Sequence, residues 1–128
     1  MNFDIVMQEA QKGVQEQAHW MKKALDANNI KEALKHSSKM LDNLKVNDVS
    51  PPDYYALFMQ VFDELMTLEQ GFRDEFQRGK KKMSDIYEVV QHAQGIIPRL
   101  YLMITTGSVV VDSGEKTADQ IIKDLFYF

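Results

Sequence analysis

Gly95-Ile96-Ile97-Pro98-Arg99-Leu100-Tyr101-Leu102-Met103-Ile104 is the stretch that decides how the second half of this chain folds. Its apolar residues continue a helical spacing that begins near Met83, and the phase survives across Pro98. Proline removes a backbone donor and clashes with the preceding turn. Two structures fit: one helix kinked at Pro98, or two helices that meet there with Pro98 at the first helical position. We favour a break or sharp kink near residues 96–98.

Arg99 lies at the centre of this apolar stretch, where a charged side chain needs a partner or a route to water. Two roles fit it. Arg99 can be a buried brace, held by a carboxylate or by free carbonyls near the break. It can also be a contact presented to another protein, because arginine and tyrosine are enriched at interface hot spots.

The sequence before this stretch predicts three amphipathic helices, each with one face buried. The first starts near the N-terminus, the second follows Asn28-Asn29, and the third follows the break at 47–53. Their apolar faces are Phe3, Val6, Met7, Ala10, Val14, Ala18, Met21 and Leu25 in the first; Ile30, Ala33, Leu34, Ser37, Leu41 and Leu44 in the second; and Tyr54, Leu57, Phe58, Val61, Leu65, Leu68, Phe72 and Phe76 in the third.

Capping residues mark the ends of these helices. Asn29 can cap the second helix, with Glu32 at the capping-box position. Ser50 is a good N-cap for the third helix, and Pro51 is tolerated in its first turn. Gly79 is expected to end that helix in the left-handed position that follows the last turn.

Residues after the central stretch predict a helix end and one more helix. Val109-Val110-Val111 is β-branched, which is a weak helix signal, and we expect a frayed helix end there rather than a strand. Asp112-Ser113-Gly114 is a turn. Thr117 with Gln120 forms a capping box that opens a last helix. Its inward residues are predicted to be Ile121, Ile122, Leu125 and Phe126.

The predicted fold is all-α, with five or six helices joined by short loops, most as antiparallel neighbours. Residues 1–128 are expected to form a single domain, since this length suits one compact core. A helical bundle and a piece of a HEAT-like α-solenoid both fit these elements.

Composition excludes several classes of protein. The net charge of −4 argues against general affinity for nucleic acid. The chain has no cysteine, which excludes disulfides and thiolate chemistry and fits a cytosolic protein. No secretory signal is visible, and the apolar stretches are too interrupted to span a bilayer. Membrane association is therefore expected to be indirect.

No enzyme motif stands out, and neither a catalytic residue nor a cofactor is predicted. Glu16 and His19 have the Glu-x-x-His spacing of di-iron bundles, but the second copy that such a site needs is missing, so a metal-binding bundle is a remote alternative. The basic cluster 78–82 is typical of a solvated helix end. Trp20 lies off the apolar face and marks a second contact face or a helix packed on both sides. The aromatic set Tyr54, Phe58, Phe62, Phe72 and Phe76 is predicted to lie in the core.

Pro98-Arg99-Leu100-Tyr101-Leu102 resembles the PRLYL signature of the Vps35 family, the large scaffold subunit of retromer. Further segments resemble the N-terminal region of that family in the same order along the chain. They are Met21-Lys22-Lys23-Ala24-Leu25-Asp26, Ala33-Leu34-Lys35-His36-Ser37-Ser38-Lys39-Met40-Leu41, Tyr54-Tyr55-Ala56-Leu57-Phe58, Asp74-Glu75-Phe76, Asp85-Ile86-Tyr87-Glu88-Val89-Val90-Gln91 and Lys123-Asp124-Leu125. The resemblance covers nearly the whole chain.

The resemblance implies a non-catalytic, HEAT-like solenoid module that sorts cargo from endosomes to the Golgi or plasma membrane. It implies that Pro98, Arg99, Leu100, Tyr101 and Leu102 bind a Vps26-like arrestin-fold subunit. A Rab7-type GTPase and a sorting nexin are further implied partners, and the implied location is cytoplasmic and peripheral on the endosomal membrane. Family members are several times longer, so the region that binds Vps29 is absent here. A short regulatory paralogue that sequesters the Vps26-like partner is the alternative.

Overall fold

The computed structural model describes residues 3–46, 49–79, 86–87, 90 and 96–125, and these residues confirm the all-α prediction. None of them lies in a strand. The helices that can be given bounds are α1 (Phe3–Asp26), α2 (Ile30–Asp42), α3 (Pro51–Gln77), α5 (Ile96–Asp112) and α6 (Ala118–Leu125). The start near Met83 that the sequence predicts for the next helix lies outside the described residues.

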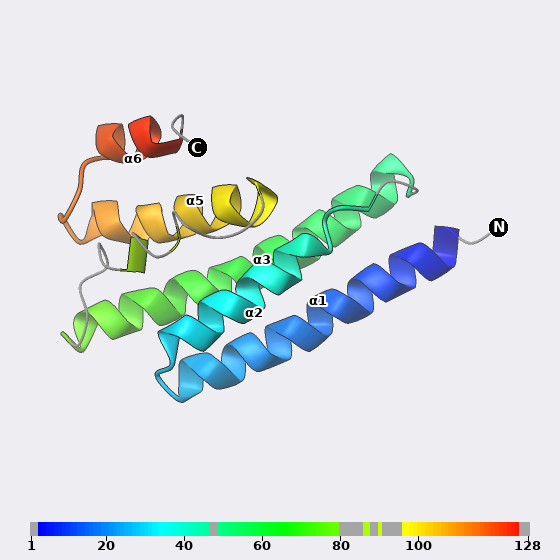
Figure 1. Cartoon of the computed structure of the whole chain (residues 1–128), viewed down its shortest axis with the longest axis horizontal. Helices are drawn as coiled ribbons and strands as arrows, with labels where there is room; N and C mark the ends of the chain where they lie inside the picture. Colours follow the sequence, from blue (N-terminus) through cyan, green and yellow to red (C-terminus); the bar gives the residue numbers. More distant parts are fainter. Residues whose placement is uncertain (1–2, 47–48, 80–85, 88–89, 91–95, 126–128) are drawn as a thin grey trace.

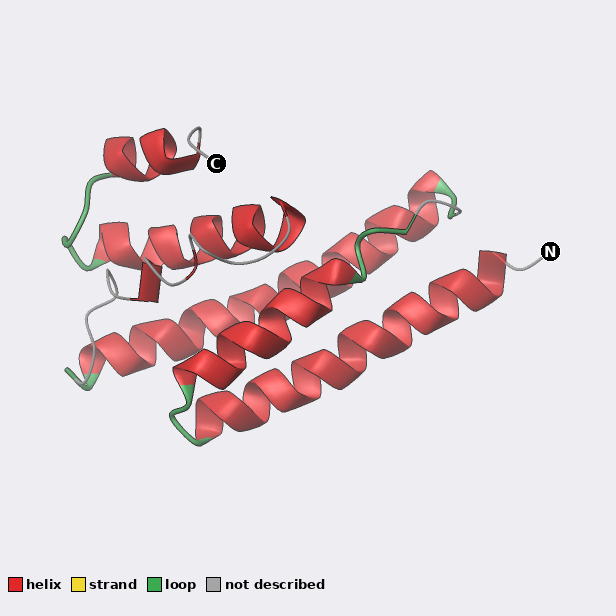
Figure 2. Ribbon diagram, in the orientation of Figure 1, coloured by secondary structure: helices red, strands yellow, loops and turns green. Residues whose placement is uncertain are grey.

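The helices are stacked so that neighbours in the chain run in opposite directions. Figure 1 shows α1, α3 and α5 running one way and α2 and α6 running the other. α2 packs along α1, α3 packs on both of them, α5 lies on α2 and α3, and α6 covers α5. Figure 2 shows the same layers, with short loops from α1 to α2 and from α5 to α6. The antiparallel arrangement of consecutive helices is therefore confirmed for α1–α2, α2–α3 and α5–α6.

Each predicted N-cap is present. Asn29 and Ser50 each accept a hydrogen bond from the backbone N–H three residues further on, at 3.2 Å and 3.3 Å. Thr117 and Gln120 exchange two bonds, from the Thr117 N–H to the Gln120 side chain at 3.0 Å and from the Gln120 N–H to Thr117 Oγ1 at 3.3 Å. These contacts satisfy backbone donors that have no partner inside the helix.

The ends of α1, α3 and α5 use the left-handed conformation that closes many helices. Asn28, Gly79 and Gly114 follow the last turns with φ values of 58°, 71° and 79°. The choice of a helix rather than a strand at Val109–Val111 is confirmed, and the three residues continue α5 to Asp112 without fraying. The backbone N–H of Glu115 bonds to the carbonyl of Val110 at 3.2 Å, which holds this end closed.

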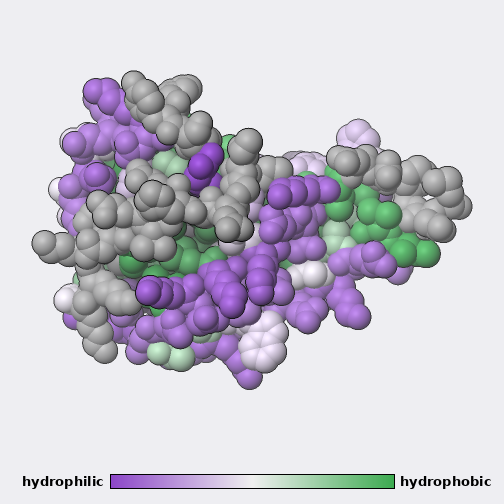
Figure 3. All heavy atoms as spheres, in the orientation of Figure 1, coloured by the Kyte–Doolittle hydropathy of each residue, from purple (hydrophilic) through white to green (hydrophobic). Residues whose placement is uncertain are grey.

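The core joins the inner faces of all the helices, and most predicted faces are confirmed. All six residues predicted for the face of the second helix are buried, and Leu44 among them lies just beyond the end of α2. Figure 3 shows hydrophobic side chains gathered at the end of the molecule where α1 begins beside the α2–α3 connection, while the rest of α1 is mostly hydrophilic on this side. Gly107 lets α6 approach α5, because a Cβ there would come within 2.8 Å of a methyl group of Ile121. Ile122, predicted inward, is exposed.

The prediction that the aromatic residues lie in the core is largely wrong. Phe72 is fully buried and Phe58 is half-buried, but Tyr54, Phe62 and Phe76 are exposed. The physical reason is coverage: α1, α2 and α5 pack on α3 but do not enclose it, so part of its apolar surface has no neighbour among the described residues. The helical spacing identified α3 correctly but could not show which of its sides the neighbours reach.

Candidate functional site

The first turn of α5 holds the motif that the sequence singled out. α5 begins at Ile96, so Pro98 is its third residue. The first four N–H groups of a helix have no intrahelical partner, and proline is therefore tolerated there. The distinction between a kink and a break depends on residues 91–95, which lie outside the described residues. Pro98 and Leu102 are buried.

Arg99, Leu100 and Tyr101 are half-buried, so their side chains reach both the interior and the surface. The Tyr101 ring packs on Phe58 of α3, with ring centroids 5.9 Å apart at 58°. Burial, and to a smaller degree the neighbouring Tyr54, raises the pKa of the Tyr101 hydroxyl. The motif thus has two inward residues that fix the turn and three that border solvent.

Apolar side chains of α3 form what we call the outer α3 face: Tyr55, Phe58 and Phe62 near this turn, and Met66 farther along the helix, where it also lines the cleft near the α1–α2 turn. Tyr55 is 64% exposed, Met66 is 52% exposed and Phe62 is 45% exposed. Phe58 stacks on Phe62 with centroids 6.4 Å apart and links the outer α3 face to Tyr101. Contiguous exposed apolar side chains of this size mark interaction sites.

An open hollow continues the outer α3 face toward the α2–α3 connection. It has a volume of about 520 Å³ and is lined by Val46, Val49, Pro51, Tyr54, Tyr55 and Phe58. Two tyrosines give this hollow hydroxyl donors beside apolar walls, a combination common at protein interfaces. Phe58 belongs to the hollow and also touches Tyr101, so the hollow and the first turn of α5 form one surface.

A charged cluster fixes α5 against α3 at the other end. Arg73 of α3 bonds to Glu69 at 2.8 Å and to Asp112 of α5 at 2.6 Å. Ser108 of α5 donates to the same Glu69 carboxylate at 3.0 Å. The hydrogen bonds to Glu69 and then to Asp112 raise the pKa of Arg73. This cluster, which the sequence reasoning missed, sets how α5 lies along the outer α3 face.

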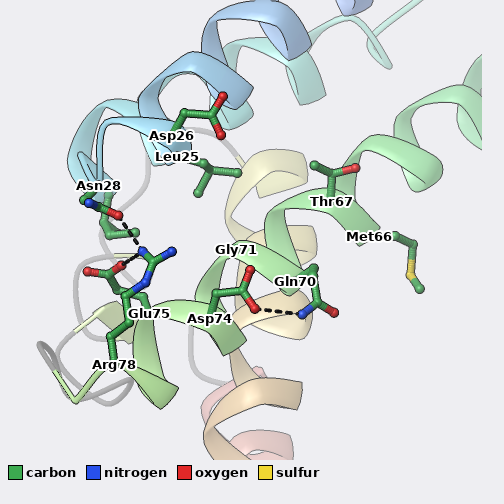
Figure 4. Close-up of a pocket in the computed structure, with 11 residues that line it drawn as sticks. Leu25, Asp26, Asn28, Met66, Thr67, Gln70, Gly71, Asp74, Glu75 and Arg78 are labelled. Atoms are coloured by element: carbon green, nitrogen blue, oxygen red, sulfur yellow. Dashed lines mark hydrogen bonds and ion pairs between the residues drawn. The ribbon is translucent and has the colours of Figure 1, made fainter.

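A polar cleft lies between the α1–α2 turn and the last turns of α3 (Figure 4). Its volume is about 530 Å³. Arg78 donates to Asn28 at 2.6 Å and to the buried carboxylate of Glu75 at 3.2 Å, and Gln70 donates to Asp74 at 3.0 Å. The polar groups in these contacts pair with one another, and the contacts of Arg78 join α1 to α3. The cleft therefore has a structural role.

The remaining sequence candidates do not gather into a site. Glu16 and His19 are both exposed, and within the described ranges no three histidine or carboxylate side chains lie close enough to hold a metal ion. Trp20 is exposed, and its ring is stacked with that of His36. The Nζ atom of Lys23 lies over the Trp20 ring, 5.4 Å from the ring centroid. Most of the basic cluster, residues 80–82, lies outside the described residues.

Comparison with known proteins shows which family the chain belongs to. Residues 6–127 match the family model described as Vacuolar protein sorting-associated protein 35. The chain belongs to the Vps35 family. It is 49% identical over 112 residues to Vacuolar protein sorting-associated protein 35C of Arabidopsis thaliana, covering 88% of this chain. It is 42% identical over 118 residues to Vacuolar protein sorting-associated protein 35 of Dictyostelium discoideum, covering 92% of this chain.

A more distant relative also matches most of this chain. Vacuolar protein sorting-associated protein 35 of Schizosaccharomyces pombe is 31% identical over 105 residues, which cover 82% of this chain. The aligned part is 14% of the Arabidopsis relative, 15% of the Dictyostelium relative and 13% of the Schizosaccharomyces relative. The chain thus corresponds to a small part of these Vps35 proteins. No helix in the described part is long and apolar enough to cross a membrane.

Proposed function

We propose that this chain is a non-catalytic scaffold module of a retromer-type complex, and that it binds a Vps26-like arrestin-fold subunit. One observation carries the proposal: the first turn of α5 is continuous with an exposed aromatic surface on α3. A scaffold needs such a surface, whereas a domain that acts alone would cover it. Membership of the Vps35 family supports the choice of complex.

The residues of the motif take different roles in this proposal. Pro98 and Leu102 are buried and hold the first turn of α5 in place. Arg99, Leu100 and Tyr101 border solvent and provide the contacts. Phe58 and Phe62 extend the surface on α3. Arginine and tyrosine, like tryptophan, are enriched among the few residues that carry most of the binding energy of an interface.

The proposal gives the chain an indirect association with membranes. In a retromer-type complex it would be recruited to the endosomal surface through the Vps26-like subunit, a sorting nexin or a Rab7-type GTPase, and would otherwise be cytoplasmic. The sorted cargo would pass to the Golgi or the plasma membrane. The chain itself would perform no chemistry.

Capture of a Vps26 subunit from the same organism tests the proposal. The immobilised chain is expected to retain the subunit, and Arg99→Ala is expected to abolish retention. Arg78→Ala is the matched control, because Arg78 lies at the end of α3 beside the polar cleft. Circular dichroism of each variant shows whether folding is intact. Equal capture by folded Arg99→Ala and by the unchanged chain would refute the assignment.

A further inference from the structure

The connection between α2 and α3 carries a serine followed directly by proline. Ser50-Pro51 is the only Ser-Pro or Thr-Pro pair in the sequence. Ser50 is exposed, and it is the N-cap of α3. A serine before proline in an exposed connection is the substrate pattern of proline-directed protein kinases.

The backbone at Ser50 already has the conformation that such a kinase needs. Its φ is −67° and its ψ is 156°, which is extended. Pro51 favours this conformation, because a proline disfavours the helical region for the residue before it. Protein kinases bind their substrates as extended segments around the acceptor hydroxyl. The acceptor residue therefore requires no change of backbone region to enter a kinase cleft.

The first turn of α3 offers little resistance to local opening. Pro51 and Pro52 have no N–H group, so neither can donate a helical hydrogen bond. The bonds that tie Ser50 to the helix come from the N–H of Asp53 at 3.3 Å and the N–H of Tyr54 at 2.9 Å. Both prolines are exposed and bury little surface. A kinase can thus separate residues 50–53 from the helix without disturbing the core.

We propose that Ser50 is a phosphorylation site for a proline-directed kinase. The step transfers the γ-phosphoryl group of a nucleoside triphosphate. The Ser50 Oγ–phosphorus bond forms, and the bond from that phosphorus to the bridging oxygen breaks. The nucleoside diphosphate leaves, and the hydroxyl proton passes to a carboxylate base of the kinase.

A phosphate at this position is compatible with the folded chain. It would lie at the N-terminus of α3, where the Asp53 N–H that now bonds to Ser50 Oγ can donate to the phosphate. It would also add a charge of about −1.5 to −2 beside Val49 and Pro51, which line the hollow. The modification would therefore change the charge of the hollow without opening the core.

The test is phosphorylation of the purified, folded chain by a proline-directed kinase with ATP, followed by mass spectrometry. The expected product carries one phosphate, on Ser50. Ser50→Ala is expected to carry none, and Pro51→Ala is expected to slow incorporation at least 10-fold. Thr117→Ala is the matched control, because Thr117 is also an exposed N-cap but is followed by Ala118. This variant is expected to react as fast as the unchanged chain.

Three results would overturn the inference. The first is phosphate on a residue other than Ser50, and the second is equal incorporation in Pro51→Ala. The third comes from a synthetic peptide of residues 44–57 assayed in parallel: a rate for the folded chain more than 100-fold below that of the peptide would show that the fold hides the site. Circular dichroism of the phosphorylated chain is expected to match that of the unmodified chain.

Discussion

The two sides of α3 differ in what covers them. The inner side holds Leu57, Val61, Leu65, Leu68 and Phe72, all buried, and it packs on α1 and α2. The outer α3 face has equally large apolar side chains, yet Tyr55, Phe62 and Met66 remain exposed. The two sides of α3 therefore have different roles. Its inner side stabilises the fold, and its outer face is available for a partner.

The largest effect is expected from a truncation on the inner side. Phe72→Ala should lower the free energy of unfolding by about 3–5 kcal/mol, because it leaves a cavity in a closely packed core. Phe62→Ala, on the outer α3 face, should lower it by less than about 1 kcal/mol, because the ring is already 45% exposed. Urea unfolding followed by circular dichroism measures both. Equal losses would show that the two sides do not differ.

A smaller effect is expected from the cluster that fixes α5 along the outer α3 face. Arg73→Gln removes the ion pairs to Glu69 and Asp112 and should lower the free energy of unfolding by about 1 kcal/mol or less, because the side chain is partly exposed. The loss should shrink in 1 M salt, which screens exposed charges. Urea unfolding at low and high salt tests this. A loss that does not change with salt would contradict an electrostatic role.

The smallest effect is expected in the pH dependence of stability. It comes from the hydroxyl of Tyr101, where α5 meets α3. Its pKa is raised in the folded chain, so the unfolded chain loses the phenolic proton first as the pH rises. The contribution to stability is complete below pH 10 and falls as the pH rises further. Tyr101→Phe should weaken this fall in thermal unfolding between pH 9 and pH 11. An unchanged profile in Tyr101→Phe would contradict the burial of the hydroxyl.

The helices and their ends could be predicted from the sequence because they depend on neighbouring residues. Asn29, Ser50 and Thr117 cap the helices as expected, since capping needs only a side-chain oxygen three residues before a free N–H. The last turn of α5 was misjudged. β-branched residues weaken an isolated helix, but Val109 and Val110 are buried and gain more from packing.

The exposed surface could not be predicted, because coverage depends on the placement of helices distant in the chain. Phe58, Phe62 and Phe72 have the same helical spacing, and only the position of α2 and α5 separates them. The candidate site itself was found from its sequence motif. Its division into the buried Pro98 and Leu102 and the half-buried Arg99, Leu100 and Tyr101 required the structure.

Calorimetric titration of a Vps26 subunit into the chain tests the division between the two sides of α3 most directly. The unchanged chain is expected to bind, and Phe62→Ala is expected to weaken binding at least 10-fold at nearly unchanged stability. Phe76→Ala is the matched control, because this phenylalanine is 39% exposed at the far end of α3 and should bind like the unchanged chain. Equal affinity of Phe62→Ala and Phe76→Ala, or no binding by the unchanged chain, would contradict the account.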